Sequence, residues 1–260
     1  MYGAIYGDLV GSVYEYDQSR KIRSINPELL LTDDSFYSDD TILTIAVLDA
    51  IMNNRDYDYY LRKYIGETLA SKYTPKFEKH FPLPFSPGLI KWFHKDEIGY
   101  SGGNGALMRI SPVGFMFDNP EEVYHNAFLA TNPSHHSFEA TYSASTLALI
   151  IYYLRKGYSK EEVYQKLKLP VHYQPFKRFN MTCYETLENC LYAFYQSSSF
   201  EDAIRKTLLM GGDTDTNAAI VGSMAEALYG IDDSIVESVQ KKLPKNYVKV
   251  LENAFEYGYR

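Results

Sequence analysis

Apolar and polar positions follow a helical period along nearly the whole chain. Residues 41–53 are almost entirely apolar but too few to cross a bilayer, which predicts a buried helix. Residues 138–156 are rich in Ala, Leu, Ile and Tyr and end at Lys156-Gly157, a typical helix stop. Further helices are predicted at about 57–72, 120–130, 183–196, 200–210, 217–229 and 245–257, and another is predicted to begin near Ser159. No series of alternating strands is found, so the pattern predicts an all-α protein.

Three irregular stretches separate these helices, at 17–37, 74–105 and 167–181. The middle stretch is dense in proline and glycine, which marks ordered loops rather than helix interiors. A loop of this length in a compact domain is often functional. The chain shows no repeat, charged tail or low-complexity linker, so residues 1–260 are predicted to form a single domain.

Composition narrows the class of protein. With 45% hydrophobic and 23% charged residues, the 260-residue chain is typical of soluble globular proteins. The net charge of −7 makes nucleic-acid binding an unfavourable interpretation, because such binding depends on basic surface. No apolar run reaches the roughly 18 residues of a membrane span, and no secretory signal pattern opens the chain.

The chain has two cysteines, Cys183 and Cys190. On one helix they would lie roughly 10 Å apart, beyond the reach of a disulfide, which is about 7 Å between Cα atoms. Two unpaired thiols fit a reducing cytoplasm, the predicted location.

Two acidic clusters stand out, and each opens a predicted helix. The first acidic cluster is Ser38-Asp39-Asp40-Thr41, and the second is Gly211-Gly212-Asp213-Thr214-Asp215-Thr216-Asn217-Ala218-Ala219. Each holds more oxygen atoms than a helix cap requires. Together they predict a site for a hard divalent cation, built from two distant parts of one fold.

Helix capping is the competing explanation for the first cluster. Ser38 is a good N-cap, and one aspartate in the first helical turn is favoured by the helix dipole. The second cluster is harder to explain in this way. Asp213 and Asp215 are two positions apart and converge in a non-helical turn, and Thr216 adds a hydroxyl. Carboxylates brought together in this way would oppose folding unless a cation is bound.

The N-terminal segment has a pattern of its own. Gly3, Gly7 and Gly11 recur every four residues and therefore share one helix face, where close helix packing would offset the cost of each glycine. Asp8 and Glu15 are seven positions apart and nearly aligned. Glu15 then either reaches the acidic centre or is an ordinary surface glutamate.

Two further segments are candidates for ligand contact. Gly102-Gly103-Asn104-Gly105 leads towards Arg109 and is either a phosphate cradle of backbone amides or a plain loop. Arg109 pairs either with a phosphate or with one of the acids. His135 stands just before the helix predicted at 138–156. The motifs of zinc proteases, α/β-hydrolases, P-loop proteins and dithiol oxidoreductases do not occur.

The motifs resemble those of the ADP-ribosylglycohydrolases, the family of the dinitrogenase-reductase-activating glycohydrolase. The resemblance rests on four segments that occur in the family's order: 3–15, 37–41, 103–114 and 211–219. The combination of the two acidic clusters is highly specific, whereas the glycine segment alone would not be.

The resemblance implies an orthogonal all-α bundle with a central binuclear Mg²⁺ centre, in which Mn²⁺ is an alternative. The implied metal ligands are Ser38, Asp39, Asp40, Asp213, Asp215 and Thr216. In the family the ions hold the ribose hydroxyls and orient water beside the anomeric carbon. The implied substrate-binding residues are Gly103, Asn104, Gly105 and His135. Glu15, Asp40 and Asp213 are the candidates for proton transfer.

Departures from the family's pattern affect some of these expectations. Ser38 replaces the usual threonine but keeps the hydroxyl, and Ala106 stands where many relatives have serine or glycine. The run around His135 keeps only part of the usual motif, which weakens its assignment.

The implied activity is removal of ADP-ribose from a modified protein side chain, with arginine slightly preferred, by cleavage at C1″. Two alternatives stay open: a hydrolase of another ADP-ribosyl small molecule, and a protein that binds ADP-ribose without cleaving it. The sequence does not indicate the oligomeric state.

Overall fold

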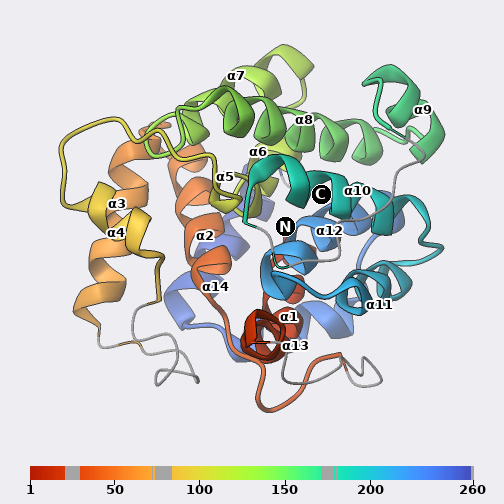
Figure 1. Cartoon of the computed structure of the whole chain (residues 1–260), viewed down its shortest axis with the longest axis horizontal. Coiled ribbons are helices and arrows are strands. Elements are labelled where there is room, and N and C mark those ends of the chain that lie inside the picture. Colours follow the sequence, from red (N-terminus) through yellow and green to blue (C-terminus); the bar gives the residue numbers. More distant parts are fainter. Residues whose placement is uncertain (21–29, 72, 74–83, 171–178, 180, 259–260) are drawn as a thin grey trace.

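The computed structural model describes residues 1–20, 30–71, 73, 84–170, 179 and 181–258, with the backbone alone described for 16–20. Throughout these ranges every regular element is a helix, as the sequence predicts, and the helices pack around α12 (Figure 1). They are α1 (Tyr2–Arg20), α2 (Asp39–Met52), α3 (Tyr57–Ala70), α4 (Pro87–Phe93), α5 (Gly105–Met108), α6 (Ser111–Met116), α7 (Pro120–Thr131), α8 (Phe138–Arg155), α9 (Lys160–Lys166), α10 (Cys183–Tyr195), α11 (Phe200–Met210), α12 (Thr214–Tyr229), α13 (Asp233–Lys242) and α14 (Lys245–Tyr257).

Helix α12 is buried on all sides from Thr214 to Glu226, and α1, α8, α10 and α11 pack around it. Its closest neighbour is α1, which lies against it along the predicted glycine face. A β-carbon added at Gly7 would lie 2.0 Å from the carbonyl oxygen of Ala218, and one at Gly11 would lie 2.3 Å from that of Thr214. The two backbones therefore touch, and this contact brings the acidic face of α1 to the start of α12.

We expect Gly7→Ala to destabilise the protein by about 3 kcal/mol, because a methyl group inserted against backbone forces the two helices apart. Gly66→Ala is the matched control. Gly66 also lies within a helix, but a β-carbon there would make only an ordinary 3.5 Å contact with the Phe93 ring. The control should gain up to about 1 kcal/mol from improved helix propensity. Urea unfolding of both variants measures the difference, and similar values for the two would contradict the close contact.

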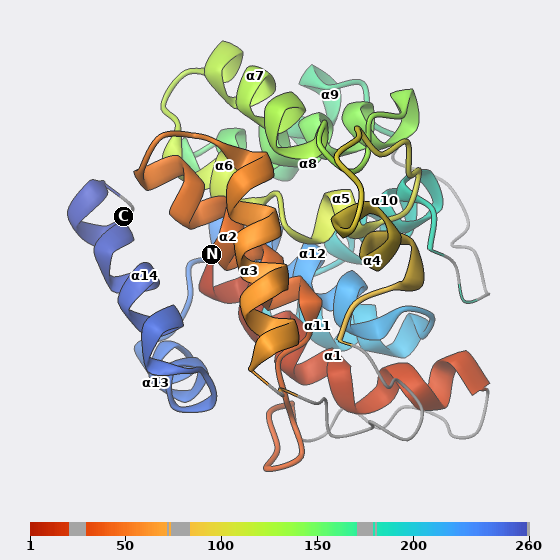
Figure 2. The same ribbon diagram turned by 90° about the vertical axis from the view of Figure 1, so that its left-hand side faces the viewer.

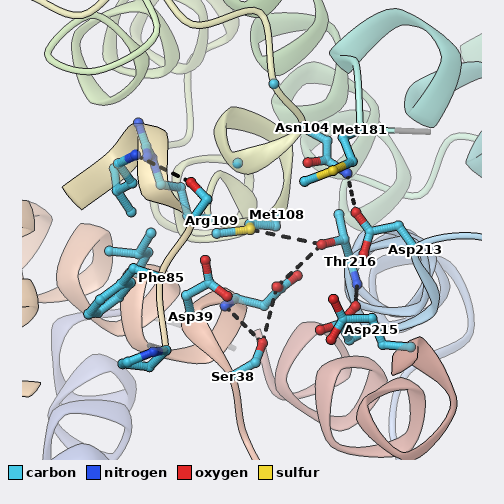
Figure 3. Close-up of a pocket in the computed structure, with 18 of the residues that line it drawn as sticks. Ser38, Asp39, Phe85, Asn104, Met108, Arg109, Met181, Asp213, Asp215 and Thr216 are labelled. Atoms are coloured by element: carbon cyan, nitrogen blue, oxygen red, sulfur yellow. Dashed lines mark hydrogen bonds between the residues drawn. The ribbon is translucent and has the colours of Figure 1, made fainter. Parts of the chain in front are cut away.

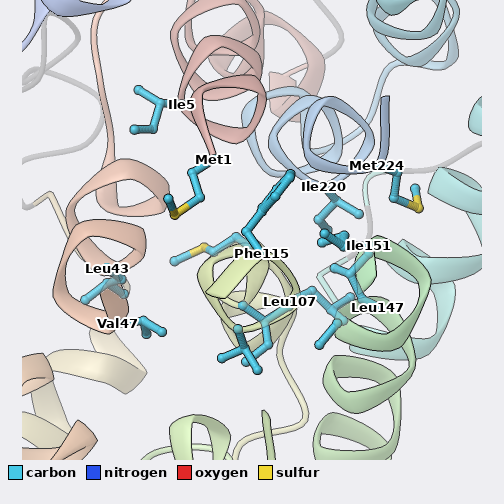
Figure 4. Close-up of a cluster of buried hydrophobic side chains, with 14 of the residues drawn as sticks. Met1, Ile5, Leu43, Val47, Leu107, Phe115, Leu147, Ile151, Ile220 and Met224 are labelled. Atoms are coloured by element: carbon cyan, nitrogen blue, oxygen red, sulfur yellow. The ribbon is translucent and has the colours of Figure 1, made fainter. Parts of the chain in front are cut away.

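The hydrophobic core joins helices that are remote in sequence. Figure 4 shows side chains of α1, α2, α6, α8 and α12 pointing into a common space, among them Ile5, Leu43, Phe115, Ile151 and Ile220. Helix α14 lies along α2, on the side of the molecule away from α4 and α10 (Figure 2). No helix of the described residues is both long enough and apolar enough to cross a bilayer.

The predicted helices are confirmed, with small shifts at their ends; α12, for example, begins at Thr214 rather than at 217. Four segments correct the prediction. Residues 17–20 extend α1, α4 forms within the proline-rich stretch, and α6 and α13 were not predicted. Residues 30–37, 94–104 and 167–170 are irregular as predicted, whereas 21–29, 74–83, 171–178 and 180 lie outside the described residues.

Local sequence accounts for one of the missed helices, α4, and tertiary packing accounts for another, α6. Helix α4 begins with Ser86 as N-cap, whose hydroxyl accepts the Leu89 amide, and with Pro87 in the first turn, where a missing N–H costs nothing. Helix α6 contains Gly114, where a β-carbon would lie 2.6 Å from Cβ of Ile151 in α8. Packing against α8 therefore decides that helix.

Candidate active site

A cavity of about 510 Å³ opens where the ends of several helices meet. Its walls come from the C-terminal half of α1, the starts of α2 and α12, the segment before α5, and residues 84–89 (Figure 3). Figure 3 shows Ser38 and Asp39 on one side and Asp213, Asp215 and Thr216 facing them from the other. The structure thus brings the two acidic clusters to one cavity.

Asp8 on α1 anchors the first acidic cluster. Its Oδ2 accepts hydrogen bonds from the backbone amides of Ser38 (2.9 Å) and Thr41 (3.0 Å) and from the Thr41 hydroxyl (2.5 Å). Ser38 is the N-cap of α2, as predicted, and its Oγ accepts the Asp40 amide and contacts Asp40 Oδ2 at 3.2 Å. Capping therefore accounts for Ser38 and leaves both aspartates available to the cavity.

The second acidic cluster depends on its two glycines. Gly211 and Gly212 adopt φ values of 72° and 85°, which favour glycine, and the turn they make starts α12 at the cavity wall. Asp213 occupies the N-cap position but makes no capping bond. Its Oδ2 instead accepts a hydrogen bond from the side-chain Nδ2 of Asn104 at 2.7 Å. Thr216 Oγ1 contacts Asp40 Oδ2 at 3.3 Å, which joins the two clusters directly.

Among the described residues, two groups of three carboxylates have oxygen atoms within 4.8 Å of one another. One is Asp8, Asp40 and Asp215, and the other is Glu15, Asp213 and Asp215. Asp215 belongs to both. Asp8 was not among the site residues predicted from the sequence. Its position on the α1 face shared by Glu15 and the three glycines was the feature that could have identified it.

The burial of these acids raises their pKa values in the absence of a cation. Burial is the largest cause for each, and it brings the pKa of Asp8 to about 7, that of Asp39 to about 8 and that of Asp213 to about 6. The negative charge of Asp215 is the second cause for Asp8 and Asp39. The pKa also lies well above its ordinary value, again mainly because of burial, for Glu15, Asp40 and Asp215.

The arrangement fits a divalent cation. Asp8 and Asp40 each have one oxygen held by hydrogen-bond donors, while the other, Oδ1, is buried with no hydrogen-bond partner in the part of the chain that the structure describes. Buried oxygens normally have partners, and a cation would supply one. The donor atoms are carboxylate and hydroxyl oxygens, which suit Mg²⁺ or Mn²⁺ and do not suit softer metals.

The glycine segment lines the cavity, but two of its amides are already engaged. Gly103 N donates to Ser101 Oγ at 3.1 Å, and Asn104 N donates to the Met181 carbonyl at 2.7 Å. A phosphate cradle, one of the two alternatives for this segment, therefore cannot use these two amides in this conformation. What the segment contributes instead is the Asn104 side chain, which holds Asp213.

Arg109 contacts Ser134 and bonds to no acid among the described residues, and its Nε and Nη1 are buried with no hydrogen-bond partner there. It is completely buried, and its Nη2 donates to the Ala130 carbonyl and to Ser134 Oγ at 2.8 Å. Ser134 Oγ lies 2.7 Å from His135 Nδ1. Because a guanidinium only donates, the serine accepts from Arg109, which leaves its own hydrogen available to His135 Nδ1. With that bond His135 is neutral and carries its hydrogen on Nε2, close to Gly103 and Gly105 at the cavity wall.

The electrostatics agree with this assignment, since burial and the Arg109 charge hold the pKa of His135 well below its ordinary value. We expect Ser134→Ala to let the ring hydrogen of His135 exchange between Nδ1 and Nε2. Ser134→Thr keeps the hydroxyl and should keep the hydrogen on Nε2. Nitrogen-15 chemical shifts of His135 report the tautomer. In Ser134→Ala, KM for a ligand that His135 contacts should rise by up to about tenfold, which is the effect of losing one hydrogen bond, and kcat should change little. An unchanged tautomer in Ser134→Ala would contradict the role of Ser134 in orienting His135.

The whole chain matches one family model. The model described as ADP-ribosylglycohydrolase covers residues 1–257. The chain belongs to the ADP-ribosylglycohydrolase family. Membership confirms the resemblance drawn from the motifs, and it places both carboxylate groups inside the segment that the family shares.

Individual members of the family are distant in sequence. The mouse ADP-ribosylhydrolase ARH3 is 21% identical, with 92% of this chain and 85% of that protein covered. The ADP-ribosylarginine hydrolase Tri1 of Pseudomonas putida (strain GB-1) is 22% identical, with 96% and 74% covered. A solved structure of an ADP-ribosylglycohydrolase-related protein complex superposes with a TM-score of 0.65 at 20% identity, covering 95% of this chain and 89% of that one. At this identity the structural match supports the fold alone.

Proposed function

We propose that this protein hydrolyses the C1″ glycosidic bond that links ADP-ribose to a protein side chain. One observation carries the proposal: carboxylates from three remote segments meet at a single cavity in a chain of this family. The cavity volume of about 510 Å³ lies in the range of small-molecule sites. Paired acids are the usual means of cleaving a glycosidic bond through an oxocarbenium-like transition state.

We propose further that two Mg²⁺ ions, or Mn²⁺, are held at the two carboxylate groups. The proposed ligands are Ser38, Asp39, Asp40, Asp213, Asp215 and Thr216, together with Asp8. When bound, such cations polarise sugar hydroxyls and lower the pKa of coordinated water.

The chain's own residues have distinct parts in the proposed reaction. Glu15 is half-buried at the cavity, in the group with Asp213 and Asp215, and is placed to pass a proton to the leaving side chain. Asp40 and Asp213 are the candidates for accepting the proton of the attacking water. Each is already oriented, Asp40 by Thr216 and Asp213 by Asn104. Orientation of this kind lowers the entropic cost of reaching the transition state.

The remaining cavity residues are proposed to bind substrate. Gly103, Asn104 and Gly105 line the cavity, and His135, with Nδ1 bonded to Ser134, is proposed to donate from Nε2 to a ligand oxygen. We also propose that residues 1–260 act as one domain. Both cysteines are free and buried, which supports the proposed cytoplasmic location.

Arginine is the proposed linkage, supported by the similarity to a protein named ADP-ribosylarginine hydrolase. To test this, the protein is incubated in Mg²⁺ buffer with each of three substrates, and the released ADP-ribose is measured. The substrates are ADP-ribosylated arginine, ADP-ribosylated serine and free ADP-ribosyl compounds. We expect at least tenfold faster release from arginine, and none from Asp213→Ala. Faster release of ADP-ribose from serine would show that serine, and not arginine, is the preferred linkage. Tight ADP-ribose binding in calorimetry without turnover of any substrate would overturn the hydrolase.

A further inference from the structure

Four aromatic side chains stand exposed beside the cavity, and we refer to them as the aromatic rim. They are Tyr100 (72% exposed), Phe138 (84%), Tyr142 (53%) and Tyr184 (55%). The rings of Phe138 and Tyr142 stack with centroids 5.8 Å apart. Tyr184 forms a hydrogen bond with Glu188, which raises its pKa, and Tyr142 adds to that effect from nearby. Large aromatic side chains gathered on a surface in this way mark an interaction site.

The rim is continuous with the cavity mouth because the same segments form both. Ser137, the N-cap of α8, donates from Oγ to the Ser101 carbonyl at 2.9 Å. The Tyr184 amide donates to Glu139 Oε1 at 2.8 Å, which links the starts of α10 and α8. Ser101 and Met181, next to these positions, line the cavity itself. The rim therefore borders the cavity on the side of Ser101 and Met181.

The charged side chains of α8 and α10 beside the rim are acidic. Helices α8 and α10 pack side by side (Figure 1). Helix α8 has no lysine or arginine before Arg155, and α10 has none at all. Glu139 and Glu188 lie beside the rim, since Glu139 accepts the Tyr184 amide and Glu188 bonds to the Tyr184 side chain. Carboxylates of α8 and α10 beside exposed aromatic faces suit arginine and lysine side chains, which stack on aromatic rings and pair with carboxylates. It does not suit phosphate-rich partners.

We propose that the aromatic rim binds basic residues flanking the modified side chain, so that the preferred substrate is ADP-ribose attached within an arginine- or lysine-rich polypeptide segment. This inference rests on the hydrolase function proposed above and specifies its substrate class. The rim contributes through KM, because it contacts the polypeptide and none of the reacting atoms.

The test compares two ADP-ribosylarginine peptides of equal length, one with arginine and lysine flanks and one with glutamate flanks, and a small ADP-ribosylarginine analogue without flanks. We expect the native protein to turn over the basic peptide at least tenfold more efficiently than the acidic one, through KM. The double variant Phe138→Ser, Tyr142→Ser and the single variant Glu188→Gln should each reduce that ratio. Tyr59→Ser removes an equally exposed aromatic (56%) on α3 and should leave the ratio unchanged.

A binding measurement separates failure of the rim from failure of the hydrolase. Fluorescence anisotropy with unmodified basic and acidic peptides reports the rim alone, at low and high salt. Tighter binding of the basic peptide without hydrolysis of any substrate would support the rim and overturn the hydrolase. Hydrolysis of the small analogue with equal binding of both peptides would overturn the rim. Dimerisation abolished by the double variant would also overturn it, because a second copy would then be the occupant.

Discussion

Asp215→Asn is expected to lower kcat/KM for the ADP-ribosylated substrate by roughly 10³-fold and, in the absence of cations, to make the protein more stable. Asp215 is the one residue shared by both carboxylate groups, so its loss affects both proposed cation positions. A 10³-fold loss corresponds to about 4 kcal/mol of transition-state stabilisation. Asparagine keeps the oxygen that accepts the Thr216 amide at 2.9 Å, so the start of α12 is preserved.

The rise in stability has an electrostatic cause. The negative charge of Asp215 raises the pKa values of Asp8, Asp39 and Asp40, in each case second only to burial. Removing it relieves repulsion among buried acids that no cation compensates. A purely structural aspartate would show the opposite effect, because its loss would cost stability.

Thermal unfolding in EDTA, together with steady-state kinetics in Mg²⁺, measures both effects. Asp118→Asn is the matched control, since Asp118 is exposed and forms only surface ion pairs with Arg155 and Lys156. That variant should stay within about twofold of native activity. An Asp215→Asn protein that keeps a tenth of the native kcat/KM, or that melts lower in EDTA, would contradict the proposed role.

Chelation is expected to abolish activity and to lower the melting temperature more at pH 8 than at pH 5. The folded-state pKa values of Asp213, Asp8 and Asp39 are raised to about 6, 7 and 8. Without cations, the stability that these protonated acids contribute is complete below the unfolded pKa of about 4. It is lost as the pH rises through 6 to 8, because the folded state must then bury charge.

Cations reverse this loss because they take the place of the protons. At a hundredfold excess over its dissociation constant, each bound ion adds about 2.7 kcal/mol. For a protein of this size that amounts to roughly 5–10 °C. Scanning fluorimetry with EDTA or Mg²⁺ at both pH values gives two melting-temperature differences. We expect a small difference at pH 5 and a large one at pH 8, with activity restored by Mg²⁺. Equal differences, or activity in EDTA, would exclude the cation centre.

Much of the fold was readable from local patterns. Helices such as α7, α11 and α14 combine amphipathic spacing with clear starts, and their predicted bounds lie within one residue of those observed. Helix α13 carried similar signals that the prediction overlooked, with Asp232 as N-cap and two lysines in the last turn. Helix α6 carried no such signal, because Pro112 and Gly114 both oppose a helix locally.

The candidate site likewise combines features set by local sequence with features set by tertiary packing. The sequence by itself determined which oxygen-bearing residues open α2 and α12, and it determined the glycine face of α1, because both follow from residue type and short-range spacing. Only the tertiary structure decided that Asp8 joins Asp40 and Asp215 and that Arg109 fixes His135 through Ser134. Asp8 and Asp215 are brought together by contact between α1 and α12, whose approach is set by backbone packing across the molecule. No local propensity encodes a contact of that kind.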